Sequence, residues 1–105
     1  MDIGSLKKES DLSYDIAVAK RNALEKAQSR LIIVYKEHIF RADSQTINLV
    51  KTLGEVHSSL FYILDTNNNP VEITNPKEFL QILIERNQEA ISSYHQMSKT
   101  FEKKN

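Results

Sequence analysis

Residues 11 to 41 read DLSYDIAVAKRNALEKAQSRLIIVYKEHIFR, and this stretch decides the expected fold. It contains neither glycine nor proline, and no such residue follows until Gly54. Apolar or amphipathic side chains recur in it at spacings of three and four, at Leu12, Ile16, Ala19, Ala23, Ala27, Leu31, Val34 and His38. This spacing places them on one face of a helix. We therefore predict a long first helix over residues 11 to 41, preceded by a flexible segment over residues 1 to 10.

Within this stretch, Leu31 to Tyr35 form an unbroken run of apolar or amphipathic residues. On a helix, five consecutive residues point in every direction rather than along one stripe. The run would then either pass through the centre of the fold or stay exposed until a partner covers it. Its composition also suits a strand, but no turn residues flank it, so we interpret it as helix.

Two further helices are expected. Asp43 or Ser44 can cap a second helix over residues 44 to 63, because the apolar pattern lapses there and both side chains accept bonds from first-turn amides. Asn75, Pro76 and Glu78 form a stronger signal, with a cap residue, a proline at the first helical position and an acid that reaches back to the cap. A third helix over residues 76 to 102 follows from it.

The segment Phe61 to Ile73 leaves two readings open. Two short β-prone runs flank the Asn-rich stretch from Asp65 to Pro70, which is typical of a hairpin. Alternatively, the second helix ends near Leu64 and an extended loop returns to the core. The predicted fold is therefore mainly α, a three-helix, bundle-like single domain over residues 11 to 105, with a short β-hairpin or extended loop between helices two and three.

Composition limits the classes of function. The chain has 105 residues, 14 Lys or Arg against 14 Asp or Glu, and no cysteine. A net charge of zero argues against a dedicated polyanion binder, and the lack of cysteine excludes disulfides, thiolate metal sites and a cysteine nucleophile. No apolar run approaches the roughly 20 residues that span a bilayer, and the N-terminus is too polar for a secretion signal. We expect a cytoplasmic protein with no membrane partner.

No catalytic constellation emerges from the sequence. His38 and His57 lie beside acidic residues at spacings that point to different helix faces, and no Glu-x-x-His or His-x-x-x-His motif occurs. Two glycines are too few for a phosphate-binding loop. We therefore expect no enzyme activity, no cofactor and no bound metal. Convergence of His38, His57 and a carboxylate in one pocket would reverse that expectation.

The expected function is that of a non-enzymatic, helical interaction or assembly protein that forms homo-oligomers or binds another protein. The expected interaction surface comprises Ala23, Ala27, Leu31, Ile32, Val34 and Tyr35. The Asn-rich loop offers a second contact through Asn67, Asn68 and Asn69, because loops are accessible. The alternative is an accessory factor that binds nucleic acid or a nucleic-acid-processing complex, for which the small Asn-, Ile- and Lys-rich composition suggests a viral origin. That alternative would be favoured by salt-sensitive binding of DNA or RNA and by Lys20, Lys26 and Arg30 sharing one surface after assembly.

Overall fold

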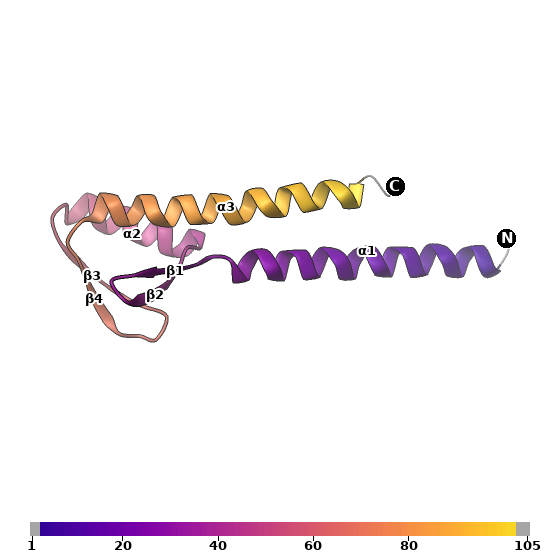
Figure 1. Ribbon diagram of the computed structural model, residues 1–105, viewed down its shortest axis with the longest axis horizontal. Helices are drawn as coiled ribbons and strands as arrows, with labels where there is room; N and C mark the ends of the chain where they lie inside the picture. The colour runs from indigo at the N-terminus through magenta and orange to yellow at the C-terminus, as the bar shows by residue number, and fades with distance from the viewer. Residues whose placement is uncertain (1–2, 103–105) are drawn as a thin grey trace.

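The computed structural model describes the backbone of residues 3–102 and the side chains of residues 13–101. Three helices and two antiparallel β-hairpins alternate along the chain (Figure 1). The elements are α1 (Ile3–Ser29), β1 (Ile32–Tyr35), β2 (His38–Arg41), α2 (Ser44–Val56), β3 (Phe61–Leu64), β4 (Pro70–Ile73) and α3 (Pro76–Glu102). The prediction of three helices is confirmed, while the bounds of the first two differ from those expected.

The bounds predicted for the first helix are wrong at both ends. It begins at Ile3 rather than near residue 11, and it ends at Ser29 rather than at residue 41. The segment interpreted as its second half is instead hairpin 1, in which β1 pairs with β2. The two turn residues, Lys36 and Glu37, have φ angles of 52° and 68°. Positive φ at both central residues is the requirement of the type I′ turn, which matches the twist of the strands it joins.

As a strand, the apolar run divides its side chains between two faces. Ile33 is buried and Tyr35 is half-buried, whereas Ile32 and Val34 are exposed. Successive side chains in a strand point to opposite sides, so five apolar residues in a row can cover a core and still present an outer face. A helix would have needed neighbours all around the same run.

The second helix begins as predicted and ends early. The Asp43 carboxylate accepts a bond from the Thr46 amide at 2.8 Å, which confirms the cap. The helix ends at Val56 instead of residue 63, and it is followed by hairpin 2, in which β3 pairs with β4. Of the two readings of Phe61 to Ile73, the hairpin is therefore confirmed. Its loop places Asn68 at a φ of 63°, a conformation that asparagine tolerates better than most residues.

The third helix begins at Pro76 and is capped by Asn75 as predicted, but the hydrogen bonds of the described residues do not include the expected one from Glu78 back to the cap. The Asn75 side chain accepts a bond from the Glu78 amide at 3.3 Å, and the Asn75 carbonyl accepts one from Phe79. The core lies where the start of this helix meets both hairpins and α2. Its fully buried side chains are Phe40, Val50, Ile73, Phe79 and Leu83. α3 contacts α1, α2 and β1, and it has 27 residues, as many as α1. The prediction that the first helix is the long one is therefore wrong.

The molecule is long rather than spherical. Its extents are 67 × 24 × 21 Å and its radius of gyration is 19.7 Å, whereas a compact chain of this length has about 13 Å. α1 and α3 lie side by side and antiparallel, and α1 continues past the end of α3 (Figure 1). α2 packs near the start of α3, where Gly54 lies against Pro76. The three helices therefore form two pairs, α1 with α3 and α2 with α3.

Candidate interaction surface

The outer face of hairpin 1 is apolar and uncovered. Ile32, Val34 and Ile39 are 43%, 70% and 39% exposed. The register places Val34 directly opposite Ile39, and Ile32 opposite Arg41. Because side chains on one face of an antiparallel pair touch their cross-strand neighbours, the three apolar residues form one patch rather than scattered exposures.

The free edge of hairpin 1 is the outer edge of β1. The amide of Ala42 donates to the carbonyl of Leu31, so those two residues form a bonded pair. Bonded and non-bonded pairs alternate in an antiparallel ladder, so the amides and carbonyls of Ile33 and Tyr35 turn inward to β2. Those of Ile32 and Val34 turn outward. Within the described residues, no other strand pairs with them.

A groove of about 450 Å³ lies between this free edge and α3. Its lining residues are Ile32, Ile33 and Val34 from β1, and Ile82, Glu85, Arg86 and Glu89 from α3. Arg86 and Glu89 form an exposed ion pair at 3.4 Å, a type of pair that contributes little to stability. The groove therefore combines an unpaired backbone edge with apolar residues of β1 and charged residues of α3.

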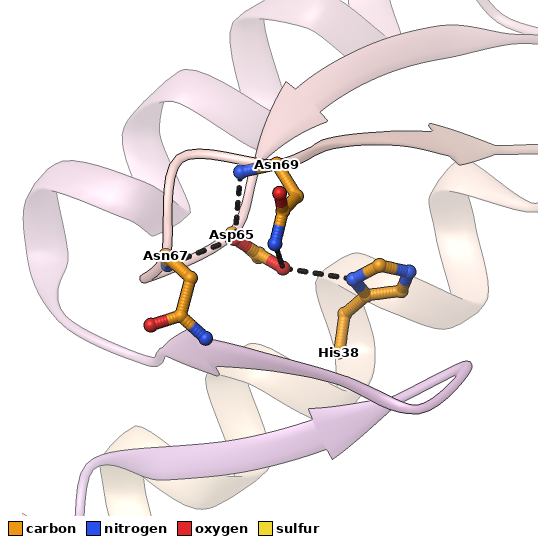
Figure 2. A network of polar contacts seen from close by, with 4 residues as sticks. All are labelled: His38, Asp65, Asn67 and Asn69. Atoms are coloured by element: carbon orange, nitrogen blue, oxygen red, sulfur yellow. Dashed lines mark hydrogen bonds and ion pairs between the residues drawn. The ribbon is translucent and has the colours of Figure 1, made fainter.

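The opposite edge of hairpin 1 is closed by hairpin 2. The amide of Thr66 donates to the carbonyl of Ile39 on β2 at 2.9 Å. Beside it, His38 Nδ1 lies 2.8 Å from Asp65 Oδ2 (Figure 2). An ionised carboxylate only accepts hydrogen bonds, so Nδ1 carries the proton of this bond. These contacts attach the loop of hairpin 2 to β2.

The Asp65 carboxylate organises that loop. Its Oδ1 accepts bonds from the amides of Asn67 and Asn69 at 2.8 and 2.9 Å, and its Oδ2 also accepts one from the Asn69 side chain at 3.4 Å (Figure 2). The amide of Asn69 and the imidazole of His38 stabilise the charged form most, and they lower the pKa of Asp65 to about 2. Asp65 is therefore a buried anion, and each of its two carboxylate oxygens accepts hydrogen bonds from neighbouring residues.

Hairpin 2 also protects its own outer strand. Pro70 on β4 has no amide hydrogen to offer at the edge. Next to it, the Lys36 ammonium approaches the Glu72 carbonyl at 3.5 Å and donates to the Thr74 hydroxyl at 3.1 Å. Prolines and lysines at edges are the devices by which proteins prevent unwanted strand pairing. β1 has neither device, since its four residues are Ile, Ile, Val and Tyr.

The residues expected to form the interaction surface separate into two groups. Ala23, Ala27 and Leu31 are buried within the protomer, and Arg30 beside them donates to Ser93 of α3 at 2.7 Å. The Ala-rich face thus faces α3 of the same chain. Ile32 and Val34 are exposed, while the ring of Tyr35 packs on Phe79 with centroids 4.8 Å apart.

Sequence reasoning missed the rest of the surface. Ile39 belongs to it because β2 pairs with β1, and Ile82, Glu85, Arg86 and Glu89 belong to it because α3 runs beneath the free edge. The β-branched Ile32, Ile33 and Val34 were the available signal for a strand, but the run has no alternation of apolar and polar residues that would show which side chains face outward. Asn67, Asn68 and Asn69 lie exposed at the tip of hairpin 2, as a contact loop requires, and their function as a contact stays a prediction.

The histidines do not form a common site. His38 meets a carboxylate, but His57 follows α2 and lines a different hollow with Leu53, Leu60, Phe61 and Tyr62. Among the described side chains, no hydroxyl bonds to His38, and no group of three metal-ligating residues occurs. No helix in the described part of the chain is long and apolar enough to cross a membrane.

Lys20, Lys26 and Arg30, the cations on which the nucleic-acid alternative depends, do not all point in one direction. Lys26 and Arg30 are one turn apart, but Lys20 precedes Lys26 by six residues, a rotation of about 600° at 3.6 residues per turn. Lys20 therefore lies on another side of the helix. Among the described side chains, Lys20 thus does not share a surface with Lys26 on one protomer, and nucleic acid as a partner stays a prediction.

No family model matches the chain, and the searches of curated proteins and of solved structures give no match either.

Proposed function

We propose that this protein is a non-enzymatic assembly module that associates with itself through hairpin 1. The single observation that carries the proposal is the uncovered apolar face made by Ile32, Val34 and Ile39. Each residue is large and β-branched, and together they occupy one side of a hairpin whose other side is core. Contiguous patches of this kind mark interaction sites in proteins that fold as monomers.

The long shape supports an assembly function. α1 and α3 extend away from the hairpins as an antiparallel pair, which separates the hairpin end from the opposite end of the molecule (Figure 1). A molecule joined at one end and extended at the other is suited to connecting parts of a larger structure. The equal numbers of acidic and basic residues also leave little repulsion between copies.

The test compares two valines of equal exposure. Val34 on β1 and Val56 at the end of α2 are both 70% exposed. Val34→Lys places a charge in the proposed contact, whereas Val56→Lys places the same charge on a surface outside it. Light scattering coupled to size exclusion, over a range of concentrations, measures the mass of each variant and of the unaltered protein.

We expect the unaltered protein and Val56→Lys to be dimeric or larger, and Val34→Lys to be a monomer over the same concentrations. A far-UV circular dichroism spectrum confirms that both variants are folded. If the unaltered protein is a monomer throughout, the proposal of self-association is wrong. If Val34→Lys and Val56→Lys behave alike, hairpin 1 is not the contact.

A further inference from the structure

We infer that two copies join edge to edge through β1, antiparallel about a twofold axis at Ile33, so that their hairpins form one four-stranded sheet. This inference rests on the proposed self-association and specifies its geometry. The contact it assigns is a backbone ladder between the two β1 strands, and the groove beside α3 receives the second strand.

The first argument is that β1 is an unprotected edge, and it belongs to the hairpin that carries the uncovered apolar face of Ile32, Val34 and Ile39. The outer edge of β2 is occupied by Thr66, and β4 carries Pro70 with Lys36 beside it. β1 instead presents the outward amides and carbonyls of Ile32 and Val34, with no charge or proline in the strand. An apolar edge of this type is a template for another strand.

The second argument is that the edge is complementary to itself. In a twofold antiparallel register centred on Ile33, Ile32 of each copy lies opposite Val34 of the other. These are the two residues whose amides and carbonyls turn outward, so both form reciprocal bonded pairs. Ile33, whose backbone groups are already bonded to Phe40, falls at the non-bonded position. A shift of one residue would oppose inward-turned groups and lose the ladder.

The third argument comes from the side chains. On the outer face, the register sets the exposed Ile32 of one copy beside the exposed Val34 of the other, which covers apolar surface from both copies. Beneath the sheet, it brings together the groove-lining stretches of the two α3 helices. Each stretch carries both signs of charge, with Arg86 between Glu85 and Glu89. An isologous contact requires such self-complementary charge.

Engineered cysteines test the register, because the chain has no cysteine of its own. Ile32→Cys and Val34→Cys are prepared as separate proteins, mixed, allowed to exchange and then oxidised. Residues opposite each other in a bonded pair have Cα atoms about 5.5 Å apart, within the range of a disulfide. Two copies of the same variant place their cysteines two residues out of register, beyond about 7 Å.

We expect the mixture to give disulfide-linked dimers at least several times faster than either variant alone, on denaturing gels without reductant. Ser92→Cys, an exposed position on α3, measures random cross-linking. If either single variant cross-links as fast as the mixture, or if no cross-link forms although light scattering shows a dimer, the register is wrong and self-association itself stands.

A proline at position 34 separates the contribution of backbone hydrogen bonds to self-association from the contribution of side-chain packing. The Val34 amide points outward and takes no part in hairpin 1, so Val34→Pro removes an edge donor without removing a bond of the fold. Val34→Thr keeps both the amide and the branched shape. We expect Val34→Pro to raise the concentration of half-association tenfold or more, and Val34→Thr to raise it much less.

The two variants keep the outcomes distinct. If folded Val34→Pro associates as tightly as Val34→Thr, edge pairing is overturned, and the face of hairpin 1 remains as the proposed contact. If Val34→Pro fails to fold, the cysteine experiment decides the register. If the unaltered protein is a monomer at every concentration, the proposed self-association fails together with its geometry.

Discussion

Phe79 lies at the centre of the core, and its replacement by alanine should remove a large part of the free energy of unfolding. The side chain has no exposed surface, and its ring lies 4.8 Å from that of Tyr35 and 5.0 Å from that of Phe40. It thus joins the start of α3 to both strands of hairpin 1. A buried phenylalanine removes about 150–250 Å² from water at about 25 cal/mol per Å². Once the methyl group of alanine is allowed for, Phe79→Ala should lower the free energy of unfolding by about 3–5 kcal/mol.

Urea denaturation followed by circular dichroism measures this loss. A domain of this size has a total stability of about 5–15 kcal/mol, so the variant should remain folded in water with a clearly lower midpoint. Ile84→Ala is the control, because Ile84 is on the same helix with an exposed side chain, and it should cost about 1 kcal/mol or less. A loss below about 1 kcal/mol for Phe79→Ala would refute a core centred on this ring.

Three further changes follow from local structure. Glu37→Gly should raise the free energy of unfolding by about 1 kcal/mol in urea denaturation, because a glycine adopts the φ of 68° at this turn position without the strain of a side chain. Gly54→Ala should raise the thermal midpoint, with a gain of about 0.5–1 kcal/mol, since the added methyl group would lie 3.7 Å from Pro76 in ordinary contact. The Asp65 pKa of about 2 lies below its ordinary value, so the stabilisation by the ionised form is complete above about pH 4 and is lost as the pH falls through 2. The stability difference between the unaltered protein and Asp65→Asn should therefore be constant from pH 7 to pH 5 in denaturation titrations and shrink towards pH 2.

The two hairpins contribute differently to the molecule, and the proposed function depends on that difference. Hairpin 2 closes the outer edge of β2 through Thr66, and the bonds of Asp65 fix its loop. The loop is thus a support for hairpin 1 as well as an exposed tip. One edge of hairpin 1 is held and the other is open, so the proposed self-association places the second copy at β1.

The candidate surface was only partly predictable. The run Leu31 to Tyr35 indicated correctly where apolar side chains lie, but it did not reveal which of them face outward. That division depends on the strand period of two, whereas the helical reading uses a period of 3.6. The α3 part of the groove comes from residues about 50 positions further along the chain, and no local pattern connects them to β1.

The sequence by itself determined the features whose bonds close within a few residues. The caps at Asp43 and Asn75, the proline start of α3 and the Asn-rich turn of hairpin 2 all satisfy backbone groups of their own neighbours. Only the tertiary structure decided the state of residues 31 to 41. Lys36 and Glu37 are not the usual residues of a type I′ turn, and the strand reading prevails because Phe40 and Tyr35 pack on Phe79, some 40 residues away. Burial against a distant helix, rather than local preference, made that segment a hairpin and left its outer edge open.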